Sequence, residues 1–233
     1  MKVVMLLSGG LDSSVLLWKL RAEGHDVRCL AVDYGQRHAR ELEAAEMVAS
    51  IAGVPLLRFP MPSLRLLLRG SSQTDDAVAV PEGHYAEESM KQTVVPNRNL
   101  ILLSLAAAHG LAEGCDAIGY AAHTGDHAIY PDCRPEFVHA AQIAFRLGNW
   151  GADGLQVLAP FLGWLKADIA ALGAELRCPM HRTWSCYKGG TRHCGRCGTC
   201  VERREAFEMA HLKDPTIGGY ICDDGPDLEG DCA

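Results

Sequence analysis

The sequence lacks a hydrophobic run long enough to cross a membrane. Its longest nearly uncharged apolar stretch, residues 100–112, has about 13 residues, whereas a membrane-spanning helix needs about 20. At the N-terminus, only five apolar residues separate Lys2 from Ser8, which is too short for a signal peptide. We therefore expect a chain that does not cross a membrane and that works in the cytoplasm.

Positive charge is also scarce. The 233 residues include 22 Lys and Arg against 29 Asp and Glu, which gives a formal net charge of −7. This excludes a general affinity for phosphate backbones, and a nucleic-acid partner would need a local basic patch. With 48% hydrophobic and 22% charged residues, the composition is that of one globular domain with a small appendage. Disorder, collagen and coiled coil are excluded.

Two common phosphate-binding motifs are missing. The sequence contains neither G-x-x-x-x-G-K-[ST] nor G-x-G-x-x-G, so kinase-like γ-phosphate chemistry and dinucleotide binding have no support. It contains instead a regular alternation of apolar strands and helical segments. We predict strands over residues 2–7, 27–34, 54–59 and 117–120, and helices over 12–23, 42–51, 99–110, 137–147, 166–176 and 201–211.

Alternation at this pitch predicts a doubly wound α/β domain, in which helices cover both faces of a parallel sheet. We assign residues 1–177 to this domain. The composition then changes to Cys, Gly and basic residues over 178–213, and residues 214–233 form an acidic tail. Residues 70–96 show little periodicity and indicate a lid or an insert, whereas the polar residues 121–137 indicate a site-forming loop.

The glycine-containing segment 8–13, Ser-Gly-Gly-Leu-Asp-Ser, follows the first predicted strand and opens the first predicted helix. Backbone amides and the positive end of the helix converge there, so we expect a bound anion. Gly9 and Gly10 would let the main chain approach a phosphate without a Cβ, and the serine hydroxyls, including that of Ser14, can donate to it. Taken alone, such a turn is equally compatible with an ordinary connection between a strand and a helix.

Four cysteines form the pattern C-x7-C-x2-C-x2-C and are Cys186, Cys194, Cys197 and Cys200. Overlapping C-x2-C pairs bring sulfurs within reach of one ion, and four thiolates complete the shell of a structural zinc. Such a zinc supplies about 10–16 kcal/mol of folding free energy to a segment with almost no apolar core. Disulfides, an iron–sulfur cluster, and ligation by His181 or His193 are less favoured alternatives. The basic residues nearby either balance the thiolates or form a face for RNA.

Residues 130–137, Tyr-Pro-Asp-Cys-Arg-Pro-Glu-Phe, place two carboxylates, an arginine and a thiol in a segment framed by prolines. Core packing does not require such a rigid presentation of polar groups, which favours a recognition segment over a salt-bridged surface loop. Arg134 has the planar fork that binds a carboxylate. Asp132 can accept hydrogen bonds from the amino and ring N–H groups of a guanine-like base.

The S-G-G-x-D-S motif after an N-terminal strand resembles the PP-loop ATP pyrophosphatases, which have an adenine nucleotide alpha hydrolase-like fold and activate a substrate oxygen as an adenylate. Four further motifs extend the resemblance to the QueC family over nearly the whole length: VDYGQRHARE (32–41), VVPNRNLILLSLA (94–106), YPDCRPEF (130–137), and TWSC followed by CGRCGTCVERREAF (194–207). It implies ATP-dependent conversion of 7-carboxy-7-deazaguanine and ammonia to 7-cyano-7-deazaguanine, in the biosynthesis of queuosine and related deazapurines. An adenylated acid and an adenylated amide would be the intermediates. A structural zinc, ATP with Mg²⁺, and a homodimer are also implied.

The resemblance also implies roles for particular residues. Contacts to ATP are expected from Leu7, Ser8, Gly9, Gly10, Leu11, Asp12, Ser13, Ser14, Val32, Asp33, Tyr34, Gln36, Arg37 and Arg98. For Arg98 and its neighbours Asn97 and Asn99, a contact to the substrate is the alternative, and Asn99 is otherwise a helix cap. Contacts to the deazaguanine are expected from Tyr130, Asp132, Arg134, Glu136 and Phe137. The expected catalytic residues are Ser8, Asp12, Ser13 and Lys166. Of these, Asp12 is expected either to hold Mg²⁺ or to cap the first helix, and Lys166 either neutralises pyrophosphate or is an ordinary surface lysine.

The residues 126–129 depart from the resemblance, because many members of the family carry an Asp-Tyr-Ser-Gly-like run there. His123 and His127 are open to three interpretations, as metal ligands, as acid and base, or as loop histidines with satisfied hydrogen bonds. One rival activity is a QueC-like variant that stops at the amide or attaches the deazaguanine to another amine. Others are a PP-loop ligase or sulfurtransferase acting on tRNA, with Cys133 carrying sulfur, and a nucleotide-binding zinc module without catalysis.

Overall fold

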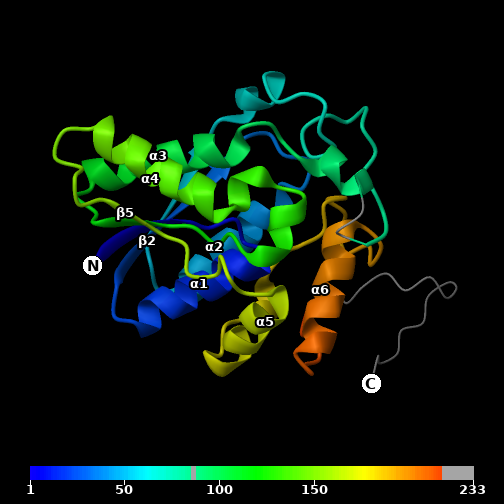
Figure 1. Ribbon diagram of the computed structural model, residues 1–233. Helices are drawn as coiled ribbons and strands as arrows, with labels where there is room; N and C mark the ends of the chain where they lie inside the picture. The colour runs from blue at the N-terminus through cyan, green and yellow to red at the C-terminus, as the bar shows by residue number, and fades with distance from the viewer. Residues whose placement is uncertain (85–87, 217–233) are drawn as a thin grey trace, which may run out of the picture.

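A computed structural model describes residues 1–84 and 88–216 and shows a parallel sheet between two layers of helices (Figure 1). The strands are β1 (Lys2–Leu6), β2 (Asp26–Asp33), β3 (Leu56–Pro60), β4 (Ala117–Gly119) and β5 (Gln156–Leu158). They lie in the order β3-β2-β1-β4-β5, and every neighbouring pair is parallel. The predicted doubly wound α/β class is confirmed.

The helices cover the two faces of this sheet. Within the described ranges the α-helices are α1 (Leu11–Ala22), α2 (Arg40–Ala52), α3 (Arg98–Ala112), α4 (Pro135–Leu147), α5 (Lys166–Glu175) and α6 (Gly198–Met209). Short 3₁₀ helices occupy Pro62–Leu66, Glu88–Thr93, Thr124–Ala128, Pro131–Cys133 and Met180–Arg182. Helices α3 and α4 lie on one face, and α1, α2 and α5 lie on the other (Figure 1).

Strand β1 shows why both faces need a cover. Val3 and Met5 belong to the core formed with α1, α2 and α5, whereas Val4 between them belongs to the core formed with α3 and α4. All three side chains are fully buried. Because successive side chains of a strand point to opposite faces, a strand that is apolar throughout requires a helical layer on each side.

The strand order also fixes where a ligand can bind. The chain first builds outward from β1 through β2 to β3, and then returns to the other side of β1 to add β4 and β5. The order therefore reverses between β1 and β4. In open α/β sheets, the crevice at the carboxyl ends of the strands beside such a reversal is the usual ligand site.

Most predicted elements are confirmed, with ends that differ by a few residues. Helix α4 begins at Pro135, two residues earlier than predicted, because the fixed φ of proline suits the first turn of a helix. Strand β5 was not predicted, since three residues at the edge of the sheet are too few to show a period. The aperiodic residues 70–96 include a packed part, because Ser71, Ser72 and Gln73 are fully buried.

The C-terminal segment packs directly on the α/β domain. Phe207 of α6 and Met180 belong to the same core as the α1 face of the sheet. Arg203 is fully buried and donates hydrogen bonds to both carboxylate oxygens of Asp214, at 2.8 and 2.9 Å. A division after residue 177 stays a prediction, because one core continues across it. Of the predicted acidic tail, only residues 214–216 lie within the described part of the chain.

Candidate active site

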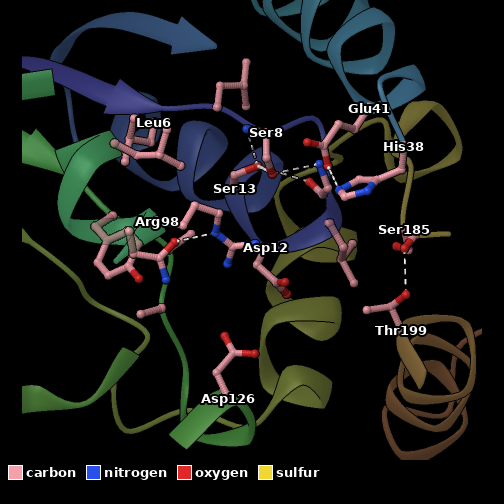
Figure 2. Close-up of a pocket in the computed structure, with 18 of the residues that line it drawn as sticks. Leu6, Ser8, Asp12, Ser13, His38, Glu41, Arg98, Asp126, Ser185 and Thr199 are labelled. Atoms are coloured by element: carbon pink, nitrogen blue, oxygen red, sulfur yellow. Dashed lines mark hydrogen bonds and ion pairs between the residues drawn. The ribbon is translucent and has the colours of Figure 1, made fainter. Parts of the chain in front are cut away.

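A pocket lies at the carboxyl ends of β1 and β4, where the strand order reverses (Figure 2). Its walls come from the turn after β1, the end of β2, the starts of α2, α3 and α5, the loop after β4, and the cysteine-containing segment. The polar and aromatic residues that line it include Ser8, Asp12, Ser13, Tyr34, His38, Glu41, Gln73, Arg98, Asn99, Tyr120, Asp126, Tyr130, Cys133, Lys166, Trp184, Ser185, Tyr187 and Thr199. Leu7, Gly10, Leu11 and Val32 complete the part of the lining that the sequence predicted.

The turn after β1 presents an open helix N-terminus to this pocket. Helix α1 begins at Leu11, and the cap residue Gly10 is extended and provides no side-chain cap. The hydroxyls of Ser8 and Ser13 lie 3.0 Å apart, and the N–H of Gly10 donates to Ser8 Oγ at 3.2 Å. N–H groups in an uncapped first turn carry partial positive charge, so this turn is suited to hold an anion. Asp12 lies inside the helix and does not cap it.

Gly9 is required by its packing against α2. Its φ is +84°, and a Cβ built there would lie 2.1 Å from the carbonyl oxygen of Glu41 and 2.6 Å from the nitrogen of Ala45. The left-handed backbone and the close approach of α2 therefore require glycine. The expected contact of the Gly9 backbone with a phosphate stays a prediction.

Lys166, the first residue of α5, lies between two acidic side chains. Its Nζ is 3.2 Å from Asp12 Oδ2 and 2.7 Å from Glu202 Oε2. Burial lowers the pKa of Lys166, but the charges of Asp12 and Glu202 raise it further, so the net pKa lies above its ordinary value. For Asp12, burial raises the pKa, and Lys166 and His123 outweigh it, so the net pKa is lowered. Both groups are therefore charged at neutral pH.

His123, which is fully buried, faces the same acidic group. Its Nδ1 accepts the N–H of Gly125 at 3.1 Å, so we infer that the ring proton is on Nε2. Nε2 lies 3.5 Å from Asp126 Oδ2 and 3.9 Å from Asp12 Oδ2. Ligand atoms of His123, Asp126 and Glu202 lie within 4.8 Å of one another, close enough to hold one metal ion. Metal binding and acid–base chemistry at His123 both stay predictions.

The predicted contacts at the end of β2 divide into two groups. Val32 and the buried Tyr34 line the pocket. The Asp33 carboxylate accepts the N–H of Gly35 at 3.1 Å, and the Gln36 amide accepts the N–H of Tyr34 at 3.0 Å. Asp33 and Gln36 thus stabilise the turn and do not line the pocket. Arg37 does the same at longer range, because it donates to the carbonyl oxygens of residues 75 and 78.

The predicted substrate segment contributes its first residues to the pocket. Tyr130 and Cys133 line it, and the Tyr130 hydroxyl is hydrogen-bonded to Thr93. Asp132 Oδ1 is buried and has no hydrogen-bond partner among the residues that the structure describes. Arg134 is exposed and donates to the carbonyl oxygen of residue 127 at 3.0 Å. The segment after Cys133, including Glu136 and Phe137, begins α4 outside the pocket lining.

Cys133 is poorly suited to carry sulfur. Its Sγ lies 3.5 Å from the hydroxyl of Tyr120 and 3.7 Å from Asn99 Nδ2. Burial, as the largest effect, raises the pKa of the thiol well above its ordinary value. Because the thiolate is the nucleophilic form, a buried thiol with a raised pKa does not favour sulfur transfer.

The four predicted metal-binding cysteines meet in space. The sulfurs of Cys186, Cys194, Cys197 and Cys200 all lie within 4.8 Å of one another, in the range expected for ligands of one ion. Backbone N–H groups of residues 196 and 197 point to the sulfur of Cys194, at 3.5 and 3.2 Å. A four-cysteine metal-binding site is thus confirmed, and its closed donor set is that of a structural ion.

This cysteine segment also forms one wall of the pocket. The backbone N–H of Trp184 donates to the carbonyl oxygen of Gly9 at 2.9 Å, which joins the segment to the turn after β1. The Thr199 hydroxyl donates to the carbonyl oxygen of Ser185 at 2.7 Å, and both residues face the pocket (Figure 2). Three cysteine ligands are fully buried in a small cluster with Trp184 and Tyr187. A bound metal would therefore fix this wall.

A family model described as "Queuosine biosynthesis protein QueC" matches residues 2–211. The chain belongs to the QueC family. It is 51% identical over 216 residues to a protein named 7-cyano-7-deazaguanine synthase from Allorhizobium ampelinum (strain ATCC BAA-846 / DSM 112012 / S4), covering 93% of this chain and 92% of that protein. A protein of the same name from Brucella ovis (strain ATCC 25840 / 63/290 / NCTC 10512) is also 51% identical, with 93% of each chain covered.

A solved structure supports the fold of this QueC protein. The NMN synthetase from Francisella tularensis superposes with a TM-score of 0.52 at 11% identity, covering 91% of this chain and 77% of that chain. At such low identity the likeness concerns the fold alone. Within residues 1–84 and 88–216, no helix of the QueC protein is long and apolar enough to span a membrane.

Several residues of this QueC pocket were not singled out from the sequence. His38 and Glu41 line it from the start of α2, and Gln73 lines it from the aperiodic segment. Glu202 meets Lys166 from a position 36 residues later in the chain. The motifs 32–41 and 194–207 contain three of these residues, but no period or spacing shows which of their side chains face the ligand. The predicted residues that do not line the pocket are Gly9, Ser14, Asp33, Gln36, Arg37, Asp132, Arg134, Glu136 and Phe137.

Proposed function

We propose that this protein is a 7-cyano-7-deazaguanine synthase. It would convert 7-carboxy-7-deazaguanine and ammonia to the nitrile, with cleavage of two ATP to AMP and pyrophosphate. The observation that carries the proposal is one pocket that combines an uncapped helix N-terminus, a buried Lys166 and an aromatic wall, in a chain 51% identical to proteins of that name. The first feature suits the phosphates of ATP, and the last suits a planar heterocycle.

The reaction consists of two similar rounds. In the first, a carboxylate oxygen attacks the α-phosphorus of ATP, an O–P bond forms, and pyrophosphate leaves. Ammonia then displaces AMP from the acyl carbon and loses a proton, which gives the amide. In the second round the amide oxygen attacks the α-phosphorus of another ATP and pyrophosphate leaves. Cleavage of the C–O bond then releases AMP, and the nitrogen gives up its two protons, which leaves the nitrile. Each oxygen of the acid thus departs as part of AMP, and one phosphate loop serves both rounds.

The residues after β1 and at the start of α5 would hold the reacting phosphates. The Ser8 and Ser13 hydroxyls and the first-turn amides would donate to phosphate oxygens, and Lys166 would neutralise the pyrophosphate as it leaves. Asp12 fits a role in holding Mg²⁺, because its Oδ1 is buried and lacks a hydrogen-bond partner. When bound, Mg²⁺ would neutralise charge on the phosphates.

The remaining components follow from the same proposal. The ion of the four-cysteine site would be zinc with a structural role, because four thiolates leave no open position for substrate. Ammonia would come from solution or from a partner protein. A homodimer and a cytoplasmic location stay predictions.

The decisive experiment is product analysis. Purified protein is incubated with 7-carboxy-7-deazaguanine, ATP, Mg²⁺ and ammonium, and the products are identified by mass spectrometry. We expect the nitrile with two AMP for each molecule formed. The Ser8→Ala, Asp12→Ala double variant should form no AMP yet keep its metal. Accumulation of the amide would instead indicate a variant that stops halfway, and no pyrophosphate release with any deazapurine acid would contradict the proposal.

A further inference from the structure

Arg98, the first residue of α3, presents a cation to the pocket without an acidic partner. Its Nε donates to Asn99 Oδ1 at 3.1 Å, and its Nη1 donates to Gln73 Oε1 at 3.0 Å. Its guanidinium lies 5.8 Å from the ring centre of Tyr130. Within residues 1–84 and 88–216, no carboxylate lies at ion-pair distance from Arg98. The positive charge is therefore compensated only by neutral amides, tyrosines and a more distant acid.

The partners of Arg98 fix its orientation and leave donors for a ligand. A guanidinium has five N–H groups, and Asn99 and Gln73 accept one each, from Nε and from Nη1. N–H groups of both Nη atoms remain, and a carboxylate can accept two parallel hydrogen bonds from them in a bidentate pair. Because Asn99 and Gln73 hold the planar group from two sides, a bound carboxylate would find the fork already oriented.

The surroundings of Arg98 differ from those of Lys166. Lys166 lies next to Asp12 and the phosphate loop, where the phosphates of ATP are expected. Around Arg98 are the rings of Tyr34 and Tyr130, and the Asp132 carboxylate acts on its charge from farther away. Flat rings suit a planar heterocycle. The two cations thus lie in different surroundings within one pocket.

We propose that Arg98 binds the carboxylate of the planar heterocyclic acid and so determines recognition of the substrate in the first round. The inference rests on the proposed function, because it concerns the acid that this function consumes. Of the two contacts that the sequence left open for Arg98, to the substrate or to phosphates, it selects the substrate. The carboxylate oxygen that is not attacking phosphorus stays on the guanidinium, which holds the acid while the other oxygen reacts.

The two rounds of the reaction make this role measurable. Only the acid carries a charge at the reacting carbon, whereas the amide that enters the second round is neutral. Loss of Arg98 should therefore weaken the first round and spare the second. A guanidinium that served the phosphates of ATP would matter equally in both, because both rounds use the same nucleotide.

The experiment compares wild type, Arg98→Gln and Arg98→Lys with the acid and, separately, with the amide as substrate. For Arg98→Gln we expect kcat/KM for the acid to fall about 100-fold, as for a charged hydrogen-bonded pair that loses one partner. For the amide, kcat/KM should fall by no more than about 5-fold, and the KM for ATP in the amide reaction should be unchanged. Arg98→Lys keeps the charge but not the planar fork, so its kcat/KM for the acid should lie between those of wild type and Arg98→Gln. Exposed Arg69 supplies the matched control, Arg69→Gln, which should leave both substrates unaffected.

Binding measurements separate this inference from the proposed function. Calorimetry without ATP should show the acid binding about 100-fold more weakly to Arg98→Gln than to wild type, and the amide binding equally to both. The unfolding midpoint and the amount of bound metal show whether each variant is folded. If Arg98→Gln does not fold, the same comparison is made with Arg98→Lys. Equal losses with acid and amide, or no loss with either, would overturn the role of Arg98. Tight, Arg98-dependent binding of the acid without turnover would overturn the proposed function alone.

Discussion

At the scale of single residues, the positive charge of Lys166 compensates two acidic side chains of the pocket. It is mostly buried and lies between Asp12 and Glu202, whose negative charges would repel each other without it. The pKa of Lys166 is raised and that of Asp12 is lowered, so the pair is ionised over the neutral range. The lysine thereby keeps a fixed positive charge next to the loop that is expected to hold phosphates.

Replacing Lys166 tests that role. In Lys166→Met we expect the rate of AMP formation to fall by about 100-fold or more, because the expected adenylyl transfer loses one preorganised cation. The unfolding midpoint should also drop, since two buried carboxylates lose their counterion. The matched control is Lys91→Met, which removes a lysine paired with Glu88 on the exposed surface. Wild-type AMP formation in Lys166→Met would contradict the assignment.

Gly9 and Gly24 have nearly the same φ but different surroundings. Replacing each by alanine therefore distinguishes the cost of the left-handed backbone from the cost of a clash with α2. Gly9 has φ +84° and would place a Cβ 2.1 Å from the Glu41 carbonyl oxygen, whereas Gly24 has φ +81° and no atom within 4 Å of that position. Gly24→Ala should cost about 1–2 kcal/mol of unfolding free energy, from the left-handed conformation alone. Gly9→Ala should cost at least about 2 kcal/mol more, because α2 must move. Denaturant unfolding measures both, and equal losses would show that α2 does not require the glycine.

At the scale of elements, the cysteine segment determines more than its own fold. The backbone N–H of Trp184 donates to the carbonyl oxygen of Gly9, and Ser185 and Thr199 face the pocket, so the cysteine site forms one wall of the pocket. A segment with three buried cysteines in a small cluster has little hydrophobic stabilisation of its own. Its order should therefore depend on the metal.

Removing the metal tests this dependence. After a strong zinc chelator and transfer into Mg²⁺-containing buffer, we expect ATP binding to weaken by about 10-fold or more, because the wall at Trp184 loses its support. Elemental analysis should find one zinc per chain before treatment, and added zinc should restore binding. A Cys194→Ser variant should behave like the treated protein. Unchanged ATP affinity in a protein proven to be metal-free would contradict the shared wall.

The elements differ in how far the sequence could predict them. Strand β1, the turn after it and α1 were predicted closely, because a buried strand and a glycine turn have strong local patterns. The three-residue β5 was missed, since its pairing with β4 rather than its own composition defines it. The cysteine site was predicted from spacing, because a metal imposes a geometry that a short sequence must satisfy.

At the scale of the whole molecule, the pocket depends on contacts between distant parts of the chain. Lys166 meets Glu202, Arg98 meets Gln73, and Trp184 meets Gly9, across 36, 25 and 175 residues. Such pairings are set by tertiary packing and leave no periodic signal in the sequence. The motifs therefore predicted which segments form the site, whereas the choice of side chains that face the ligand required the structure.

The central claim is that this pocket transfers AMP to an oxygen of the substrate acid. The most direct measurement uses 7-carboxy-7-deazaguanine labelled with ¹⁸O at both carboxylate oxygens, followed by mass spectrometry of AMP, pyrophosphate and water. One labelled oxygen in each of the two AMP molecules formed, with none in pyrophosphate or water, is the expected result. Label that appears in pyrophosphate or water and never in AMP would contradict the claim.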